Sequence, residues 1–205
     1  MQNVNGWFLP DGEKHLVRYL ARDGEYQKKL RENALQYVKK FDCAIDVGAH
    51  CGLWTRDLAA KFKKVYAFEP IEDHLNCLVK NIKTKNVFMY QYLLGHSNHS
   101  FSPKLNPEST GSTYFKHDPS GSFRCKRLDD FEFDKVDFIK VDVEGFEYFV
   151  FRGAKQTILK HRPTINFEQK FTRYVAEGCA GAYLEKLGMR CVSKKSSERV
   201  YSFSD

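Results

Sequence analysis

The feature that most constrains the fold is a regular alternation of short apolar runs and helical stretches along the chain. Apolar runs bounded by turn residues predict strands, and apolar residues three and four positions apart predict helices. A chain that alternates strand and helix forms a mostly parallel sheet with helices on both faces. The fold class is therefore α/β, with strands expected over residues 43–47, 65–68, 87–94, 136–143 and 164–168, helices over residues 53–62, 72–83, 146–160 and 174–187, and a C-terminal antiparallel hairpin over residues 189–194 and 199–203.

Two segments interrupt this rhythm. Residues 1–40 show helical spacing on both sides of Gly24 and are expected to form a helical N-terminal cap. Residues 95–126 hold three of the six prolines and predict an inserted loop or hairpin near the active site. Neither segment is long enough to form a second core, so residues 1–205 are expected to form a single domain.

Charge and hydropathy exclude several classes of protein. The 205 residues carry 33 Lys and Arg against 26 Asp and Glu, and the excess is spread as +3, +1 and +3 over residues 1–40, 41–103 and 104–205. Because nucleic-acid binders usually cluster their basic residues, nucleic acid is disfavoured as a partner. No apolar stretch approaches the roughly 20 residues of a membrane-spanning helix. The N-terminal residues lack a signal-peptide pattern, so a cytoplasmic protein is expected.

The six cysteines and seven histidines give no metal-binding pattern. No two cysteines form a Cys-x-x-Cys pair, and no two histidines form a His-x-x-x-His pair. Structural zinc sites normally use such closely spaced ligands. The cysteines are therefore expected to be free and mostly packed, and the histidines carry no predicted role.

The first chemical signal is the turn between the first expected strand and the helix after it. Residues 46–52 place Asp46 where a dinucleotide-binding turn has its first glycine, and a carboxylate there would repel a diphosphate. A nicotinamide oxidoreductase is therefore disfavoured, and a cationic cofactor without phosphate, S-adenosylmethionine, is favoured. Gly48, Ala49 and Gly52 are small enough for the backbone to approach such a ligand.

The next expected strand also ends in a carboxylate. Glu69 stands 23 residues after Asp46 and is followed by Pro70, which ends the strand. An acidic side chain at this place can accept hydrogen bonds from both ribose hydroxyls of a nucleoside. The alternative is an exposed acidic turn, but two such signals in order on successive strand ends favour a cofactor site.

At this point the sequence resembles the S-adenosylmethionine-dependent FkbM-type methyltransferases. The resemblance runs from about residue 41 to 170 and rests on the segments IDVGAHCG at 45–52, YAFEP at 66–70, GST at 111–113, RLDD at 127–130, FIKVDVEGFE at 138–147, FRGA at 151–154 and PTINFE at 163–168. It implies a Rossmann-like class I methyltransferase fold, with residues 46–52 near the methionine part of the cofactor and Glu69 on its ribose. The expected cofactor contacts also include Leu53, Pro70, Ser112 and Asp142.

The second chemical signal is a strand that finishes with charge. The two-residue period of a strand puts Lys140, Asp142 and Glu144 on one side, at the carboxyl end where α/β sheets bind ligands. Transfer of a methyl group to a hydroxyl needs a base for the hydroxyl proton or a metal that lowers its pKa. Asp142 is the predicted base or metal ligand, Glu144 would support its pKa or share the metal, and Lys140 would pair with either. The alternative role for the two acids is a helix cap.

Other residues are weaker candidates. Glu168, at the end of the next strand, and Tyr114 are expected to contact the substrate. Trp7, Phe8 and Phe115 could close the crevice, although packing is the commoner role of aromatic residues.

The function that these signals favour is an O-methyltransferase acting on a hydroxyl of a sugar, glycan or related natural product. A divalent metal and the oligomeric state stay open. One alternative is a nucleic-acid methyltransferase, although the Asp/Asn-Pro-Pro-aromatic motif of amino-group methyltransferases is missing. The other is a non-catalytic binding module of the same fold.

Overall fold

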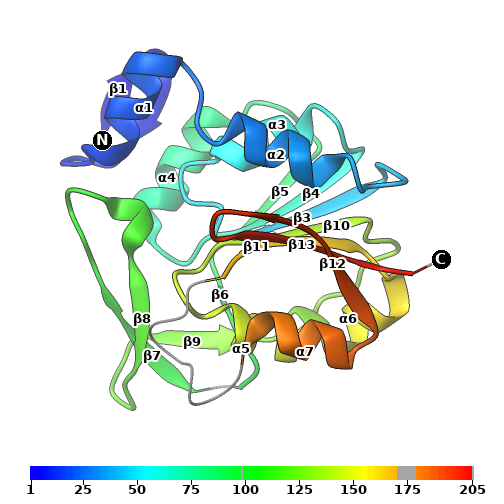
Figure 1. The fold of residues 1–205 in the computed structure, drawn as a ribbon. Coiled ribbons are helices and arrows are strands. Elements are labelled where there is room, and N and C mark those ends of the chain that lie inside the picture. The colour runs from blue at the N-terminus through cyan, green and yellow to red at the C-terminus, as the bar shows by residue number, and fades with distance from the viewer. Residues whose placement is uncertain (98, 170–178, 205) are drawn as a thin grey trace.

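A seven-stranded sheet forms the centre of the molecule (Figure 1). The computed structural model describes residues 1–97, 99–169 and 179–204. The spatial order of the strands is β12-β13-β11-β10-β3-β4-β5. Five strands run parallel, β3 (Cys43–Val47), β4 (Lys64–Phe68), β5 (Val87–Tyr90), β10 (Phe138–Val141) and β11 (Thr164–Glu168), while β13 (Glu198–Phe203) is antiparallel to both β11 and β12 (Met189–Lys195).

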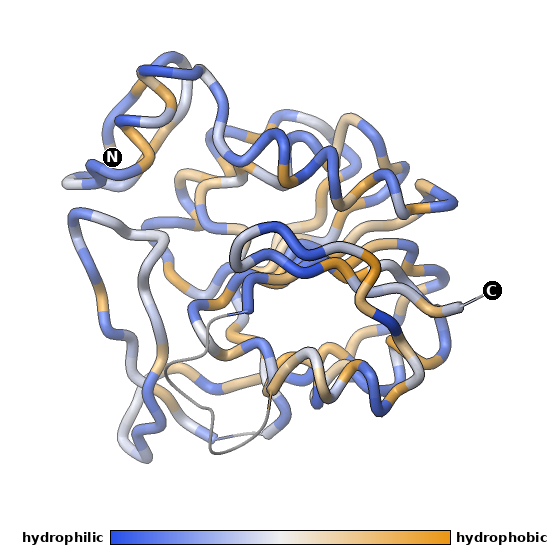
Figure 2. Tube along the Cα trace, in the orientation of Figure 1, coloured by the Kyte–Doolittle hydropathy of each residue, from blue (hydrophilic) through white to orange (hydrophobic). Residues whose placement is uncertain are grey.

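Helices cover both faces of this sheet (Figure 1). One face carries α2 (Lys28–Leu35), α3 (Leu53–Ala59) and α4 (Glu72–Asn81), and the other carries α5 (Glu147–Arg152), α6 (Lys155–His161) and α7 (Ala180–Lys186). Every residue of β3 and β10 is buried, as expected for strands that are covered on both faces. Figure 2 shows the same distribution, with hydrophobic residues concentrated along the central strands. The expected mostly parallel sheet, with its helices and C-terminal hairpin, is confirmed.

Several expected elements differ in detail. The N-terminal cap is not wholly helical, because a hairpin of β1 (Gln2–Val4) and β2 (Trp7–Leu9) precedes α1 (His15–Asp23). The strand expected over residues 87–94 is two strands in different sheets, β5 and β6 (Leu93–Leu94). The C-terminal helix is observed as α7, and residues 174–178 of its expected range lie outside the described residues.

The long helix expected over residues 146–160 is broken into α5 and α6 at Gly153. A Cβ atom at Gly153 would lie 1.9 Å from the carbonyl oxygen of Gly95, so only glycine allows this close approach of the two backbones. Gly95 begins the insertion, which is therefore fixed against the break between the two helices.

The insertion is a small sheet rather than a loop or single hairpin. Its strands β7 (Ser100–Lys104), β8 (Tyr114–His117) and β9 (Phe123–Lys126) join β6, which directly precedes the insertion, in the order β6-β9-β7-β8. A single turn of 3-10 helix, η1 (Thr110–Ser112), lies in the connection between β7 and β8. This turn reaches the carboxyl edge of the large sheet.

The N-terminal hairpin and α1 pack beside the same edge. Trp7 and Leu9 are buried against Leu53, and the amide of Phe8 donates a hydrogen bond to Asn81 Oδ1 at 2.8 Å. The segment also meets the insertion, where Lys14 N–H donates to the carbonyl oxygen of Glu108 at 3.0 Å. Two segments therefore flank the carboxyl edge of the large sheet: the N-terminal hairpin with α1, and the insertion with η1.

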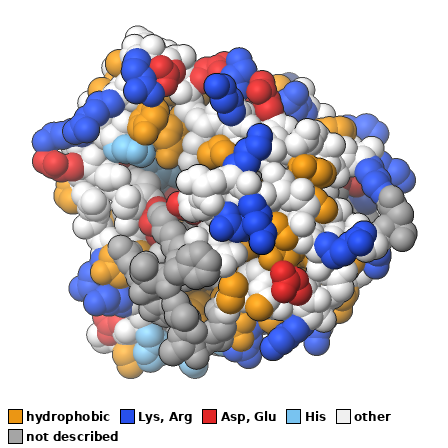
Figure 3. All heavy atoms as spheres, in the orientation of Figure 1, with side chains coloured by type: hydrophobic (Ala, Val, Ile, Leu, Met, Phe, Trp, Pro, Cys, Tyr) orange, Lys and Arg blue, Asp and Glu red, His pale blue; other side chains and the backbone are white. Residues whose placement is uncertain are grey.

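The surface agrees with the dispersed charge of the sequence. Lys and Arg side chains are scattered over the face drawn in Figure 3 and do not gather into one patch. Among the described residues, no helix combines the length and the apolar character required to cross a membrane.

Candidate active site

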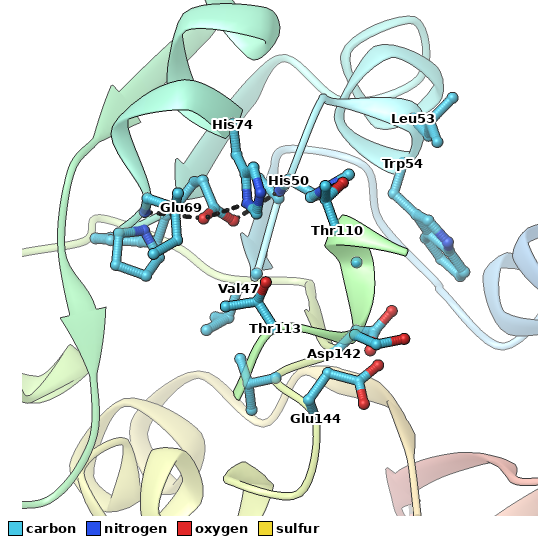
Figure 4. A pocket seen from close by; sticks show the side chains of 18 of the residues that line it. Val47, His50, Leu53, Trp54, Glu69, His74, Thr110, Thr113, Asp142 and Glu144 are labelled. Atoms are coloured by element: carbon cyan, nitrogen blue, oxygen red, sulfur yellow. Dashed lines mark hydrogen bonds and ion pairs between the residues drawn. The ribbon is translucent and has the colours of Figure 1, made fainter. Parts of the chain in front are cut away.

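A cavity of about 270 Å³ opens at the carboxyl ends of β3, β4, β10 and β11. Four parts of the chain line it: the N-terminal segment, the β3–α3 turn, the η1 turn of the insertion, and the ends of the strands. Figure 4 shows two polar groups at its opposite ends, with Glu69, His74 and His50 at one end and Asp142 and Glu144 at the other. Of the predicted site residues, the cavity is lined by Gly48, Ala49, Leu53, Glu69, Pro70, Ser112, Lys140, Asp142, Glu144 and Glu168.

Asp46 does not line this cavity. Its side chain is fully buried, accepts a hydrogen bond from Thr55 Oγ1 at 2.6 Å and lies 3.2 Å from Lys140 Nζ. Asp46 and Lys140 are direct neighbours in the register of β3 and β10, which explains the pairing. The sequence predicts direct contact between Asp46 and the cofactor, but the structure does not place Asp46 in contact with a ligand in this cavity. Its carboxylate pairs instead with Lys140, which lines the cavity.

The two glycines of the turn are needed for reasons that differ from those expected. A Cβ atom at Gly48 would lie 2.0 Å from the carbonyl oxygen of Asp142, so glycine lets two strand ends approach each other. A Cβ atom at Gly52 would lie 2.5 Å from Leu78 Cδ1, and Gly52 does not line the cavity. Both glycines also have φ near +80°, which other residues rarely adopt. Gly52 therefore serves the packing of α3 on α4 rather than contact with a ligand.

Glu69 is held firmly at its end of the cavity. The side chain is buried, and Oε2 accepts a hydrogen bond from the amide of His50 at 2.9 Å. Oε1 accepts from the amide of Ile71 at 3.0 Å and from His74 Nδ1 at 3.2 Å. A carboxylate offers about four acceptor positions, so Glu69 keeps one for a ligand hydroxyl.

Two histidines at this end had no predicted role. The rings of His50 and His74 lie edge to face with their centroids 4.3 Å apart, and both line the cavity. Burial, followed by the nearby charges of His74 and Lys140, lowers the pKa of His50 well below its usual value. His50 stands inside the β3–α3 turn, where the sequence predicts cofactor contacts, and that position is the signal that could have identified it.

The other end of the cavity is acidic. Carboxylate oxygens of Asp142, Glu144 and Glu168 lie within 4.8 Å of one another. Lys140 Nζ lies 3.9 Å from Asp142 and donates a hydrogen bond to the carbonyl oxygen of Gly48 at 2.9 Å. Burial opposes the charge of Lys140, but the carboxylates of Asp46 and Asp142 outweigh it and raise the pKa of the ammonium group.

The negative charge of these acids contributes to raised pKa values of two neighbouring side chains. Burial, and then the carboxylate of Asp142, raises the pKa of Glu198 to about 7. Burial and the same carboxylates also raise the pKa of Tyr26, which lines the cavity from the N-terminal segment. An incoming cation or hydrogen-bond donor would therefore be favoured here, and an anion would be disfavoured.

Glu147, the first residue of α5, stabilises the turn between β10 and that helix. Its Oε1 accepts hydrogen bonds from the amides of Val143 at 3.2 Å and Gly145 at 3.1 Å. Both amides precede α5, whose N-cap residue Phe146 makes no side-chain cap hydrogen bond. Glu144, for which the sequence offered a helix cap as an alternative role, lines the cavity beside Asp142.

Replacing Glu147 with glutamine is expected to keep both hydrogen bonds, because one oxygen accepts both. Burial raises the pKa of Glu147 to about 7, and each unit of such a shift corresponds to about 1.4 kcal/mol. Because the folded-state pKa lies above the unfolded value, the wild-type protein loses stability as the pH rises from about 4.5 to 7. Urea unfolding should show that Glu147→Gln loses less stability over this range. An unchanged pH dependence would contradict the assignment of this carboxyl.

The aromatic candidates divide into two groups. Phe115 lines the cavity, whereas Tyr114, Trp7 and Phe8 are not among its lining residues. Trp7 is buried in the N-terminal cluster, where the guanidinium carbon of Arg56 lies 3.7 Å from the centre of its ring. Tyr114 is therefore not placed to contact a substrate in this cavity, and the neighbouring Thr113 lines it instead.

The chain resembles known methyltransferases in sequence and in fold. A family model described as the methyltransferase FkbM domain matches residues 46–191. No curated protein matches the chain. The solved structure of a methyltransferase FkbM from Methylobacillus flagellatus KT superposes with a TM-score of 0.52 at 18% identity, covering 80% of this chain and 43% of that one.

Two other solved structures match over more of their length. A precorrin-6y C5,15-methyltransferase from Geobacter metallireducens GS-15 has a TM-score of 0.52 at 15% identity, with 90% of this chain and 92% of that chain covered. A precorrin 8w decarboxylase from Methanobacterium thermoautotrophicum has a TM-score of 0.53 at 15% identity, with both chains covered completely. At these identities the likeness shows the fold, a Rossmann-like class I methyltransferase fold.

Proposed function

The chain belongs to the FkbM methyltransferase domain family, and from this we propose that it is an S-adenosylmethionine-dependent O-methyltransferase. Its proposed acceptor is a hydroxyl of a sugar, glycan or related small natural product in the cytoplasm. The observation that carries the proposal is one cavity with a buried carboxylate suited to a ribose hydroxyl at one end and a carboxylate suited to a proton at the other.

The residues at the two ends would divide the work between binding and proton transfer. S-adenosylmethionine, when bound, supplies an electrophilic methyl group on a positively charged sulfur. Glu69 would accept a hydrogen bond from the ribose, and Gly48 and Ala49 would form the wall beside the methionine part. Asp142 would accept the proton of the acceptor hydroxyl, and Lys140 would hold that carboxylate from below. Holding the acceptor oxygen in line with the methyl carbon is the larger part of the catalysis.

The charge of the acceptor end narrows the proposed substrate. Three carboxylates within 4.8 Å of one another would repel a phosphate group, so a neutral or cationic acceptor rich in hydroxyls suits this end better than a nucleic acid. The sugar or natural-product acceptor is favoured on this ground, and the nucleic-acid alternative is disfavoured.

The same three carboxylates have the chemistry of a divalent-cation site. Mg²⁺, Ca²⁺ and Mn²⁺ prefer oxygen ligands, and carboxylate oxygens at this spacing fit one hard cation. Asp142, Glu144 and Glu168 would hold such an ion, and its positive charge would lower the pKa of an acceptor hydroxyl. Lys140 already supplies one positive charge at this place, so the proposed reaction does not require the metal.

Calorimetry with S-adenosylhomocysteine tests the cofactor half of the proposal. Glu69→Gln is expected to weaken binding at least tenfold. Three groups donate hydrogen bonds to the Glu69 carboxylate, and the glutamine amide would turn an N–H donor toward at least one of these donors. Glu72→Gln is the matched control, since Glu72 is exposed in the first turn of α4. No binding by the wild-type chain would refute the proposal. Binding without methylation of any acceptor would favour a non-catalytic module.

A further inference from the structure

A chain of buried polar side chains connects the N-terminal segment to the cofactor end of the cavity. Glu13 is 1% exposed, and its Oε2 accepts hydrogen bonds from the amide of Thr110 at 2.6 Å and from its hydroxyl at 2.5 Å. The other oxygen of Glu13 accepts from the amide of Leu16 at 2.8 Å. His50 Nε2 lies 2.8 Å from the same threonine hydroxyl. Three segments that are distant in the sequence thus meet at Thr110.

The order of donors and acceptors in this chain is fixed. Thr110 has one hydroxyl hydrogen, which it donates to Glu13, so it accepts a hydrogen bond from His50 Nε2–H. This places the proton of the neutral His50 ring on Nε2. Figure 4 shows Thr110 beside His50, and His50 in turn beside His74 and Glu69.

His50 needs such support because its backbone is in the left-handed region. Its φ is 50°, a conformation that a residue with a side chain keeps only where the surroundings hold it. This backbone conformation aims the amide of His50 at Glu69 Oε2, 2.9 Å away. The hydrogen bond from the His50 ring to Thr110 and the hydrogen bond from the His50 backbone amide to Glu69 therefore fix the side chain and the backbone of the same residue.

We infer that Glu13 and Thr110 are positioning residues for the cofactor. Through His50 they hold the carboxylate of Glu69 in the orientation that leaves one acceptor position for the ribose. Glu13 precedes residues 46–191, the part that the family model matches, so the N-terminal segment adds a determinant of cofactor affinity to that domain. The inference rests on the proposed function and deepens it by adding residues to its cofactor site.

Substitutions that keep the shape but change the hydrogen bonds test this inference. Thr110→Val removes the hydroxyl, and Thr110→Ser keeps it. Glu13→Gln keeps the shape, but Glu13 accepts at both oxygens, so either orientation of the amide places an N–H group against a donor. We expect Thr110→Val and Glu13→Gln each to raise the Kd for S-adenosylhomocysteine at least tenfold in calorimetry on the full chain. Thr110→Ser should stay within threefold of wild type.

A matched control separates this effect from a general loosening of the contact. Lys14→Ala breaks the exposed ion pair of Lys14 with Glu108, 2.5 Å long, which joins the same two segments outside the buried chain. Exposed pairs contribute little, so this variant should bind like wild type. A Kd within twofold of wild type for Thr110→Val, or no recovery with Thr110→Ser, would overturn the inference. If the wild-type protein does not bind S-adenosylhomocysteine, the proposed function is refuted, and so is this inference, which rests on it.

Discussion

Replacing Asp142 with asparagine is expected to slow methyl transfer at least a hundredfold. An alcohol keeps its proton at neutral pH, so a group at the site must accept that proton as the new bond forms, and a positioned base contributes about 10²- to 10⁴-fold. Asparagine has nearly the same shape but cannot take up a proton. Asp142 stands at the acceptor end of the cavity, beside Glu144 and Glu168 and 3.9 Å from Lys140.

The measurement is the formation of S-adenosylhomocysteine with a hydroxyl-bearing acceptor that the wild-type protein methylates. Calorimetry on the same variant should show a much smaller change in cofactor affinity than in turnover, because the base acts on the acceptor. Asp134→Asn is the control, since the side chain of Asp134 is 95% exposed, and its turnover should equal that of wild type. A turnover of Asp142→Asn within tenfold of wild type would remove Asp142 from the role of base.

The ends of the strands could be found from the sequence because they follow a local rule. Acidic residues at the ends of apolar runs located Glu69, Asp142, Glu144 and Glu168, and parallel strands bring their carboxyl ends to one edge. All four line the same cavity. The parallel character of the sheet followed from the alternation of strands and helices, which the spacing of apolar residues and the length of each segment reveal.

Other features depend on which strands are neighbours, and local pattern does not contain that information. The sequence placed Asp46 correctly on the first expected strand. Its pairing with Lys140, however, requires β3 to lie beside β10, and β10 begins 95 residues after β3 begins. The split of residues 87–94 arises because the chain leaves one sheet and enters another, while its apolar character continues.

The buried chain from Glu13 to His50 shows the same limit more strongly. Glu13 and Thr110 are 97 residues apart, and Thr110 and His50 are 60 apart. Each residue taken singly has an ordinary sequence context, and only the packing of the N-terminal segment against the insertion brings them together. Side chains that act through such long-range contacts need a structure to be identified.

Replacing Lys140 with methionine is expected to lower the stability of the fold by about 3–5 kcal/mol. Lys140 and Asp46 are 6% and 0% exposed in their side chains, and their charged atoms are 3.2 Å apart. Methionine fills similar space but leaves the Asp46 carboxylate buried with a hydrogen bond from Thr55 and no opposite charge. A buried charge without a partner is far less stable than the pair.

The double variant Asp46→Asn with Lys140→Met distinguishes this cause from lost packing. Asparagine can still accept the Thr55 hydrogen bond and carries no charge, so the double variant should recover much of the stability that Lys140→Met loses in urea unfolding at neutral pH. Because the pKa of Lys140 is raised in the folded protein, the pair stabilises the fold fully below the ordinary lysine pKa and loses its contribution only as the pH rises through the folded-state value. Wild type should therefore lose its advantage over the double variant in strong alkali. If the double variant is as unstable as Lys140→Met alone, the penalty comes from the shape of the lysine site and not from the uncompensated charge of Asp46.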